Sequence, residues 1–467
     1  MKLKKLNARG FSHDILLVLF VVIFAIAGVA YLVATRASTS TSTFTTYAGS
    51  QNTPASLQPT ALGKTLYALK TFNNKIYAGY GDYGANTGPI AITPFAFDQA
   101  TNTFTFASTA ENSPCVQNIG SSGQPLNTDI TETWRYVGSA NPIDPNTGKP
   151  ATGNIQYDFG NCDQTEAIGL YRVLNGKLYA PSSDPRGSDS TDYAVGTAST
   201  NGSVSWQQFG TKLPAIYEGV GMTHAFDMNS IPGTNDLWMV GSQGNDAVAY
   251  HSLNGGATWA KMADVAPTAT YPGGYDRFYA AGVYNGKVYF QAVMIDSNNN
   301  EVGSEPKSHV CDDTACTAGP SLTLNNMWHP EAFAGKMIYQ TWPGVDNPSA
   351  TYLVSFDGSN TQTITATPGG VYDYTIDGNT LYALSGFGTI YSATLDSTTG
   401  LLNWYVQSTA PTTARSIAVM NNVIYVGTTD SKIYKAPVNT APSSISGSTS
   451  GGGKTHGGGK GGHVPKQ

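Results

Sequence analysis

Hydrophobic and polar residues recur along the chain in one pattern: an apolar run, a short polar turn, and an apolar run that begins with an aliphatic and an aromatic residue. Such runs on both sides of Asn-Gly predict a β-hairpin, because both central residues of a type I′ turn need positive φ. The pattern occurs seven times, at residues 73–77, 175–179, 235–238, 285–289, 335–339, 378–382 and 421–425. It therefore predicts seven hairpins.

The spacing of these hairpins predicts the architecture. Their aromatic residues follow one another at intervals of 102, 59, 51, 50, 43 and 43 residues, and two more strand-like runs follow most hairpins. Four strands per unit of 40 to 60 residues are typical of a β-propeller. A pair of β-sandwiches is the alternative, but sandwiches do not repeat one hairpin pattern seven times. We therefore expect an all-β, seven-bladed propeller over residues 61–438.

The ends of this repeat body are less regular. The last unit is one strand short, and residues 43–47, within a linker at residues 36–60, are expected to supply that strand and close the ring. The first interval is too long, which indicates an insertion at about residues 111–162 between the first two blades. Cys115 and Cys162 lie at its ends and are expected to form a disulfide. Cys311 and Cys316 are expected to form a second, local one, because the N-terminus indicates export to an oxidising compartment.

The N-terminal segment is expected to anchor the chain in a membrane. Residues 15–35 form an uncharged apolar run long enough to cross a bilayer, and residues 1–14 carry four cations, which predicts a cytoplasmic N-terminus and an extracytoplasmic propeller. A cleaved signal peptide is the main alternative. Arg9-Gly10-Phe11 also resembles a type IV prepilin leader, which implies a pilin-like assembled subunit, although Ile15 stands where prepilins have Glu.

Charge and composition exclude some partners and cofactors. Eight of the 25 cations but only one of the 31 anions lie in the N-terminal segment and the tail, so the body carries about −13. Such a body repels a phosphate backbone, so we expect no nucleic-acid partner. Residues 439–467 are rich in Gly, Ser, Lys and His and are expected to be disordered. Seven histidines, two of them in this tail, and no nucleotide or zinc motif predict no cofactor and no metal site.

One motif indicates a family. Ser252, Asn254, Gly256, Thr258 and Trp259 match the Asp-box S-x-D/N-x-G-x-T-W, and residues 199–206 form a degraded second copy. The chain thereby resembles the sialidase-like (BNR) propellers. The resemblance implies a structural turn in which Asn254 bonds backbone and Trp259 packs between blades. It does not carry over sialidase activity, because the Arg-Ile-Pro motif is absent and no tyrosine matches the nucleophile.

Polar residues just upstream of the hairpins are the candidate site, because the inner strands of a propeller converge on its central channel. Glu166, Glu331 and Asp373 are the catalytic candidates. Candidates for ligand binding are Arg172, Arg186, His224, Asp227, Arg277, His329 and Arg415, with Tyr171, Trp328 and Tyr372 as stacking surfaces. These residues could also simply pair with one another around a channel.

Two functions fit this arrangement. The first is a non-catalytic receptor or adhesin that binds a surface glycan or protein outside the cell. The second is a glycoside hydrolase that uses two carboxylates of the ring, which requires them to lie about 5 to 10 Å apart. The pattern favours the first, and it predicts neither the ligand nor the oligomeric state.

Overall fold

The computed structural model describes residues 42–46, 53–58, 60–82, 90, 95–98, 103–106, 143–144, 149–150, 167–181, 193–209, 224–267, 272–298, 300–322, 327–341, 351–364, 370–395 and 402–444. The expected anchor at 15–35, the cysteines Cys115 and Cys162, and the candidates Glu166 and Arg186 lie outside these residues. Within them, no helix combines the length and the apolar character that crossing a bilayer requires.

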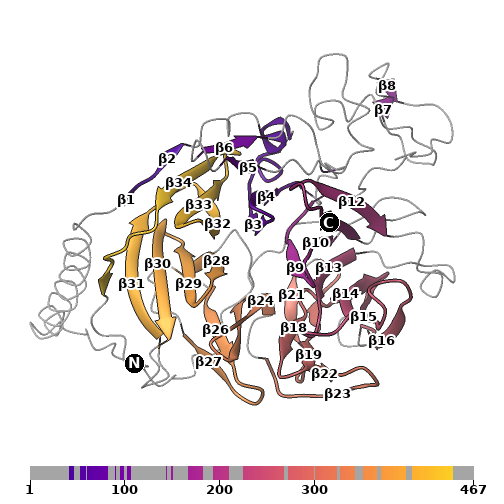
Figure 1. Ribbon diagram of the computed structural model, residues 1–467. Coiled ribbons are helices and arrows are strands. Elements are labelled where there is room, and N and C mark those ends of the chain that lie inside the picture. The colour runs from indigo at the N-terminus through magenta and orange to yellow at the C-terminus, as the bar shows by residue number, and fades with distance from the viewer. Residues whose placement is uncertain are drawn as a thin grey trace, which may run out of the picture.

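The described chain is built from antiparallel sheets arranged around a common centre as the blades of a β-propeller (Figure 1). We number the sheets of four or more strands in chain order, from the first to the seventh. The first sheet has β3 (Ala68–Phe72), β4 (Lys75–Gly79), β5 (Phe95–Asp98) and β6 (Thr103–Phe106), and the second has β9 (Arg172–Leu174), β10 (Lys177–Pro181), β11 (Tyr193–Ala198) and β12 (Val204–Phe209). The third has β13 (His224–Asn229), β14 (Leu237–Gln243), β15 (Asp246–Ser252) and β16 (Ala260–Val265).

The remaining sheets continue this order around the ring. The fourth has β18 (Gly282–Tyr284), β19 (Lys287–Phe290), β22 (His309–Cys311) and β23 (Cys316–Ala318), and the fifth has β24 (Met327–Phe333), β25 (Lys336–Thr341), β26 (Leu353–Phe356) and β27 (Thr361–Thr363). The sixth contains β28 (Val371–Asp377), β29 (Thr380–Ser385), β30 (Thr389–Leu395) and β31 (Leu402–Thr409), and the seventh contains β32 (Ala414–Met420), β33 (Val423–Thr428) and β34 (Ile433–Pro437). In each sheet the first strand is the inner one, and inner strands of neighbouring sheets touch, as β28 and β32 do.

The ring is closed by the segment that the sequence predicted. β2 (Thr45–Thr46) pairs antiparallel with β34 as the fourth strand of the seventh sheet, and β32 contacts β3 of the first sheet. Two pairings were not expected: β1 (Ser42–Thr43) lies parallel to β31 at Ser408 and Thr409, and β35 (Ser443–Ser444) pairs antiparallel with β31 at Tyr405 and Val406. Among the described residues, strand pairing therefore continues beyond 438, to Ser444.

Most hairpin turns have the predicted backbone. Asn175 and Gly176 have φ of 50° and 73°, and the equivalent pairs at 73–74, 285–286, 334–335 and 421–422 also lie in the left-handed region. The connection between the first two strands of the third sheet is different, because β13 ends at Asn229 and β14 begins only at Leu237. The Asn235-Asp236 pair therefore ends a longer loop instead of forming a two-residue turn.

The fourth unit is divided into two sheets. β17 (Tyr275–Arg277), β20 (Val293–Ile295) and β21 (Glu301–Ser304) form a three-stranded sheet, and β17 contacts β15. Along the chain β17 comes before β18, β20 follows β19, and β21 comes before β22. A separate two-stranded ladder joins β7 (Ile143–Asp144) and β8 (Lys149–Pro150), and a short 3₁₀ turn covers Pro54–Leu57.

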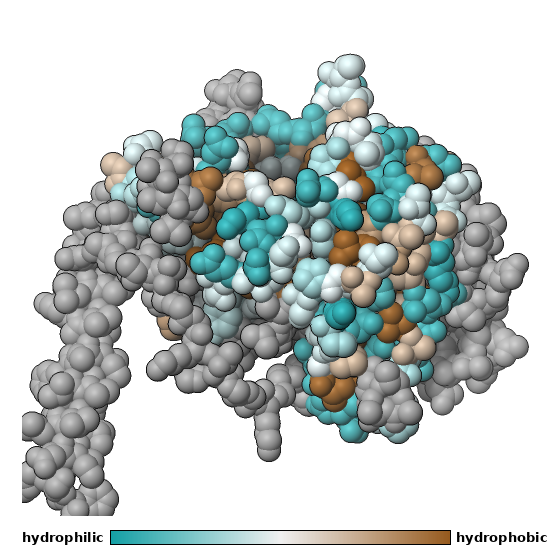
Figure 2. All heavy atoms as spheres, turned by 90° about the horizontal axis from the view of Figure 1, so that it is seen from below, coloured by the Kyte–Doolittle hydropathy of each residue, from teal (hydrophilic) through white to brown (hydrophobic). Residues whose placement is uncertain are grey.

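Aromatic side chains fill the spaces between adjacent sheets. The Trp259 ring of the third sheet lies 5.8 Å from that of Tyr193 in the second, and Trp206 of the second lies 6.1 Å from Tyr77 in the first. These contacts bury large apolar areas between sheets, which is how a ring of blades forms its core. The side of the molecule seen in Figure 2 carries only small, separate hydrophobic patches among hydrophilic ones.

Candidate functional site

A buried ion pair joins the inner strands of the second and third sheets. Arg172 donates two hydrogen bonds of 2.8 Å from Nε and Nη2 to the two carboxylate oxygens of Asp227, and both side chains are almost fully buried. Arg172 Nη1 donates to the carbonyl oxygen of Pro330 in the fifth sheet, 2.7 Å away. One guanidinium group therefore links three sheets through bidentate and single bonds.

Glu331 on β24 connects this pair to the first sheet. Its Oε1 accepts a 2.8 Å bond from Lys70 Nζ and lies 3.4 Å from Arg172 Nη1. The Glu331 side chain is 28% exposed and that of Lys70 22%, so this is the solvent-accessible end of the cluster. Among the described residues, the polar contacts of the Glu331 carboxylate all use Oε1.

His329 lies between Glu331 and Asp373. Its Nε2 is 3.6 Å from Glu331 Oε1 and its Nδ1 is 3.3 Å from Asp373 Oδ1. The Tyr374 hydroxyl reaches the carbonyl oxygens of His329 and of Ile338, the latter at 2.9 Å. We call Lys70, Arg172, Asp227, His329, Glu331, Asp373 and Tyr374 the inner-strand network.

Bulges in the inner strands aim the aspartates at the neighbouring sheet. The strand register shifts between Ala225 and Asp227 and between Val371 and Asp373. As a result Asp227 Oδ2 accepts the backbone N–H of Ala281, and Asp373 Oδ2 accepts that of Ile417, each at 2.9 Å. Both aspartates therefore join blades through backbone bonds, in addition to their ionic contacts.

A further bulge shapes the chain around His329. The register of β24 shifts between Trp328 and Glu331, and His329 has a φ of 50°. A non-glycine residue in the left-handed region is uncommon and is found at constrained sites. The bulge turns the carbonyl groups of His329 and Pro330 toward Tyr374 and Arg172, respectively.

The electrostatics of the network keep Glu331 ionised. Burial acts to raise the pKa of Glu331, but Lys70, His329 and Arg172 outweigh it and hold this pKa well below its usual value. Burial acts to lower the pKa of His329, whereas the adjacent carboxylates of Asp373 and Glu331 raise it above its ordinary value. Burial, reinforced by Glu331, raises the pKa of the Tyr374 hydroxyl well above its usual range, so this group stays protonated.

Arg277 and Arg415, two further predicted binding residues, have partners outside the inner-strand network. Arg277 Nη1 donates to the carbonyls of Gly244 and Asp276, and its guanidinium lies 4.1 Å over the Tyr275 ring. Arg415 Nη1 donates to the carbonyls at 412 and 414 and its guanidinium lies 4.3 Å over the Tyr372 ring. Each guanidinium is thus held by its own set of partners, as Arg172 is held by Asp227.

The aromatic candidates have different surroundings. Tyr171 is 1% exposed and packs against Tyr77 between the first and second sheets, so it belongs to the core and offers no stacking surface. Trp328 is half-buried, on the bulged strand next to His329. Tyr372 is partly exposed but is already covered by Arg415.

His224 lies in a second buried position at the start of β13. It is 5% exposed, and burial together with the charge of Arg277 lowers its pKa to about 3. His224 is therefore neutral across the physiological range.

Sequence reasoning thus placed Arg172, Asp227, His329, Glu331 and Asp373 in one region and missed two members of the network, Lys70 and Tyr374. Lys70 lies three residues before the first hairpin turn, on an inner strand, and is the only charged residue of β3. Its position in the repeat was the signal that could have identified it. Tyr374 looks like one more core aromatic of a strand, and no sequence feature distinguishes it.

Residues 252–259, the segment that resembles an Asp-box, form the hydrogen-bonded turn between β15 and β16. Asn254 Oδ1 accepts bonds from the Ser252 hydroxyl (2.9 Å) and the Thr258 N–H (2.8 Å), and Asn254 Nδ2 donates to Thr258 Oγ1 at 2.8 Å. Trp259 Nε1 donates to the carbonyl of Gly256, 3.2 Å away. In the degraded copy Asn201 likewise accepts the Ser203 N–H. The turn of Asn254 thereby holds the Trp259 ring directly before β16.

Replacement of Asn254 by alanine is expected to lower the free energy of unfolding by about 1–2 kcal/mol, because three bonds of the turn are lost at an exposed position. Chemical denaturation measures this value. Asn254→Asp, which keeps the acceptor oxygen, is the matched control and should lose less. Equal losses in both variants would contradict the role of the acceptor.

No protein-family model matches the chain. No curated protein matches its sequence. Solved structures resemble it in shape: a putative 6-phosphogluconolactonase from Bacteroides fragilis is 11% identical, with a TM-score of 0.42, over 81% of this chain and 95% of that one. YCF48 from Cyanidioschyzon merolae is 11% identical with a TM-score of 0.41, over 81% and 97% of the two chains. The α-L-arabinanase of Penicillium chrysogenum is 14% identical with a TM-score of 0.35, over 57% and 91%. At these values the likenesses assign neither a family nor an activity.

Proposed function

We propose that the chain is a seven-bladed propeller of sialidase-like architecture, held outside the cell by its N-terminal segment, that binds a neutral glycan at the inner-strand network without cleaving it. Support for the blade count comes from the seven repeats of the hairpin pattern and the seven sheets of four or more strands among the described residues. The anchor and its orientation rest on the apolar run at 15–35 and the cations before it.

The observation that carries the binding proposal is the state of Glu331. This carboxylate is partly exposed, has its pKa held well below the usual value, and has all its described polar contacts at one oxygen. The second oxygen can accept a hydrogen bond from a ligand hydroxyl. Lys70 and Arg172 are interleaved with Asp227, Glu331 and Asp373, and the raised pKa of His329 favours its cationic form. Such a mixed site suits an uncharged polyhydroxylated ligand better than an acidic one.

The same electrostatics argue against the hydrolase alternative. A two-carboxylate mechanism requires one carboxylic acid whose pKa is raised so that it can protonate the leaving group. Glu331 has the opposite shift, and Asp373 Oδ2 is engaged by the Ile417 N–H. The imidazole of His329 lies between these two carboxylates and leaves no direct path for a sugar to bridge them.

A glycan array probed with the full-length chain tests the proposal, with released sugar assayed on every hit. Replacement of Glu331 by glutamine is expected to weaken binding of the glycans that the wild type binds on the array by at least tenfold. The reason is that a charge-assisted hydrogen bond contributes about 1.5–3 kcal/mol. Glu305→Gln is the matched control, since Glu305 has similar exposure (21%) and also bonds a histidine, His309. It should bind as the wild type does.

The other outcomes are distinct. Equal binding by wild type and Glu331→Gln would overturn the assignment of the site. Sugar release that Glu331→Gln abolishes would favour a hydrolase. An array without hits would favour a protein ligand.

A further inference from the structure

A second polar cluster lies between the third and fourth sheets, away from the inner strands. It consists of Asp236 at the end of the β13–β14 loop, His251 near the end of β15, and Asp313 in the β22–β23 loop. Their ligand atoms all lie within 4.8 Å of one another. We propose that these three side chains bind a divalent transition metal ion of the Zn²⁺ type that fastens the two blades together.

His251 provides the strongest indication. Its ring is 4% exposed and stacks on Trp238 with 4.2 Å between centroids. Its Nε2 is buried and, among the described residues, has no hydrogen-bond partner. This nitrogen lies 3.6 Å from Asp236 Oδ2 and 3.8 Å from Asp313 Oδ1, just beyond hydrogen-bonding distance of both. A buried ring nitrogen without a partner is costly unless a proton or a metal ion joins it to such neighbours.

The spacing suits a metal better than direct bonds. Two donors that are each about 2.0–2.1 Å from a tetrahedral zinc ion lie about 3.4 Å apart. The two distances from His251 Nε2 are within a few tenths of an ångström of this value. Asp313 has an exposed side chain (56%), so it can move to complete the geometry, and water can enter as the fourth ligand.

The surrounding bonds hold two of the ligands in place. Trp238 Nε1 donates to Asp236 Oδ2 at 3.2 Å, and the Ile231 N–H donates to Asp236 Oδ1 at 3.1 Å. Such outer contacts orient ligating carboxylates in metal sites. Asp236 directly precedes β14, and β14 pairs Trp238 with His251 of β15, so the strand register brings Asp236 beside His251.

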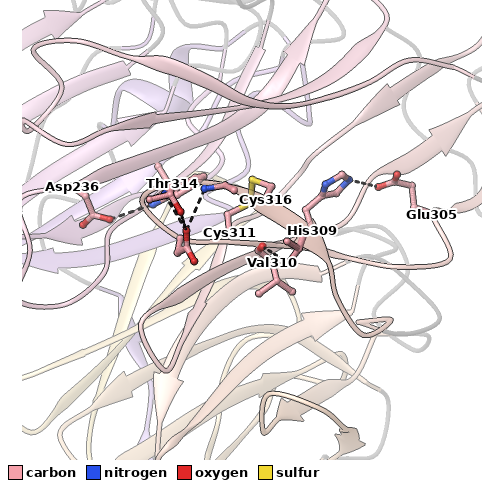
Figure 3. Close-up of a disulfide and its surroundings, with 11 residues drawn as sticks. Asp236, Glu305, His309, Val310, Cys311, Thr314 and Cys316 are labelled. Atoms are coloured by element: carbon pink, nitrogen blue, oxygen red, sulfur yellow. Dashed lines mark hydrogen bonds and ion pairs between the residues drawn. A yellow bond between two sulfur atoms is a disulfide. The ribbon is translucent and has the colours of Figure 1, made fainter.

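The disulfide loop presents the third ligand. Asp313 lies in the four-residue loop between Cys311 and Cys316, which their disulfide closes (Figure 3). Asp312 Oδ1 accepts bonds from Thr314 N (3.0 Å) and Ala315 N (3.2 Å), so Asp312 is engaged inside the loop, whereas Asp313 extends toward the third sheet. The disulfide and this turn keep the loop short and fixed in shape.

The test measures metal binding by the full-length chain in which His456 and His463 of the tail are replaced by alanine, so that the tail cannot contribute. After removal of metal by a chelator, we expect one Zn²⁺ per chain with a raised thermal midpoint, and a visible d–d absorption band when Co²⁺ is bound instead. Asp313→Asn and His251→Gln are expected to weaken binding at least tenfold and to abolish the Co²⁺ band. Asp264→Asn is the matched control, because Asp264 is an exposed carboxylate on the third sheet, which also carries His251. This variant should bind Zn²⁺ as the wild type does.

Because Asp313 is exposed, Asp313→Asn should fold even if His251→Gln does not. A stoichiometry far below one Zn²⁺ per chain, or unchanged binding and an unchanged Co²⁺ spectrum in Asp313→Asn, would overturn the proposal.

Discussion

Replacement of Arg172 by methionine is expected to lower the free energy of unfolding by about 3–5 kcal/mol, the usual result of removing one partner of a buried ion pair. The variant leaves Asp227 fully buried with its charge uncompensated, and it also removes the bond to the Pro330 carbonyl. Denaturant-induced unfolding of the purified chain measures the loss.

Two further variants separate the ion pair from packing effects. In Arg172→Met/Asp227→Asn the buried charge is absent, so the double variant should be more stable than the sum of the two single losses predicts. Lys261→Met removes a cation from the exposed pair with Asp264 and should change stability by no more than about 1 kcal/mol. A loss below about 1 kcal/mol in Arg172→Met would show that the pair does not hold the three sheets together.

Acidification from pH 6.5 to pH 4.5 is expected to remove about 2–3 kcal/mol of stability through His224 alone. Burial and the charge of Arg277 lower its folded-state pKa from 6.5 to about 3, whereas the unfolded chain takes up a proton below pH 6.5. The contribution of this neutral histidine is therefore present above pH 6.5 and is lost as the pH falls, by about 1.4 kcal/mol per unit. The measurement is the difference in unfolding free energy between wild type and His224→Gln at several pH values.

His329 provides the control for this pH experiment. Its folded-state pKa is raised, so its contribution is fully present below pH 6.5 and is lost as the pH rises through the raised value. The unfolding free energy of His329→Gln should therefore fall with acidification as that of the wild type does. It should differ from the wild type in its pH dependence above pH 6.5. An identical acid limb in wild type and His224→Gln would contradict the assignment of His224 as a buried neutral group.

Much of the ring could be predicted because hairpin signals are local. Asn175-Gly176 and Asn285-Gly286 have the predicted positive φ, since few other residues adopt that backbone. The closing strand could be predicted from the missing fourth strand of the last unit, and β2 fills that position. The Cys311–Cys316 disulfide is also local and was confirmed.

The inner-strand network was only partly predictable. Counting upstream from each hairpin placed Glu331, His329 and Asp373 near the centre, because equivalent positions of a repeat converge in space. The count could not predict the bulges, which depend on how each inner strand fits its neighbour. Those bulges direct Asp227 and Asp373 to backbone N–H groups of the next sheet.

By itself, then, the sequence determined the all-β repeat, its hairpins and the strand that closes it, because turn chemistry and strand alternation act over a few residues. Only the tertiary structure decided which charges meet: Arg172 with Asp227, Lys70 with Glu331, and His251 with two aspartates of different blades. These partners are far apart in sequence, and their distances are set by packing between sheets, which no local pattern records.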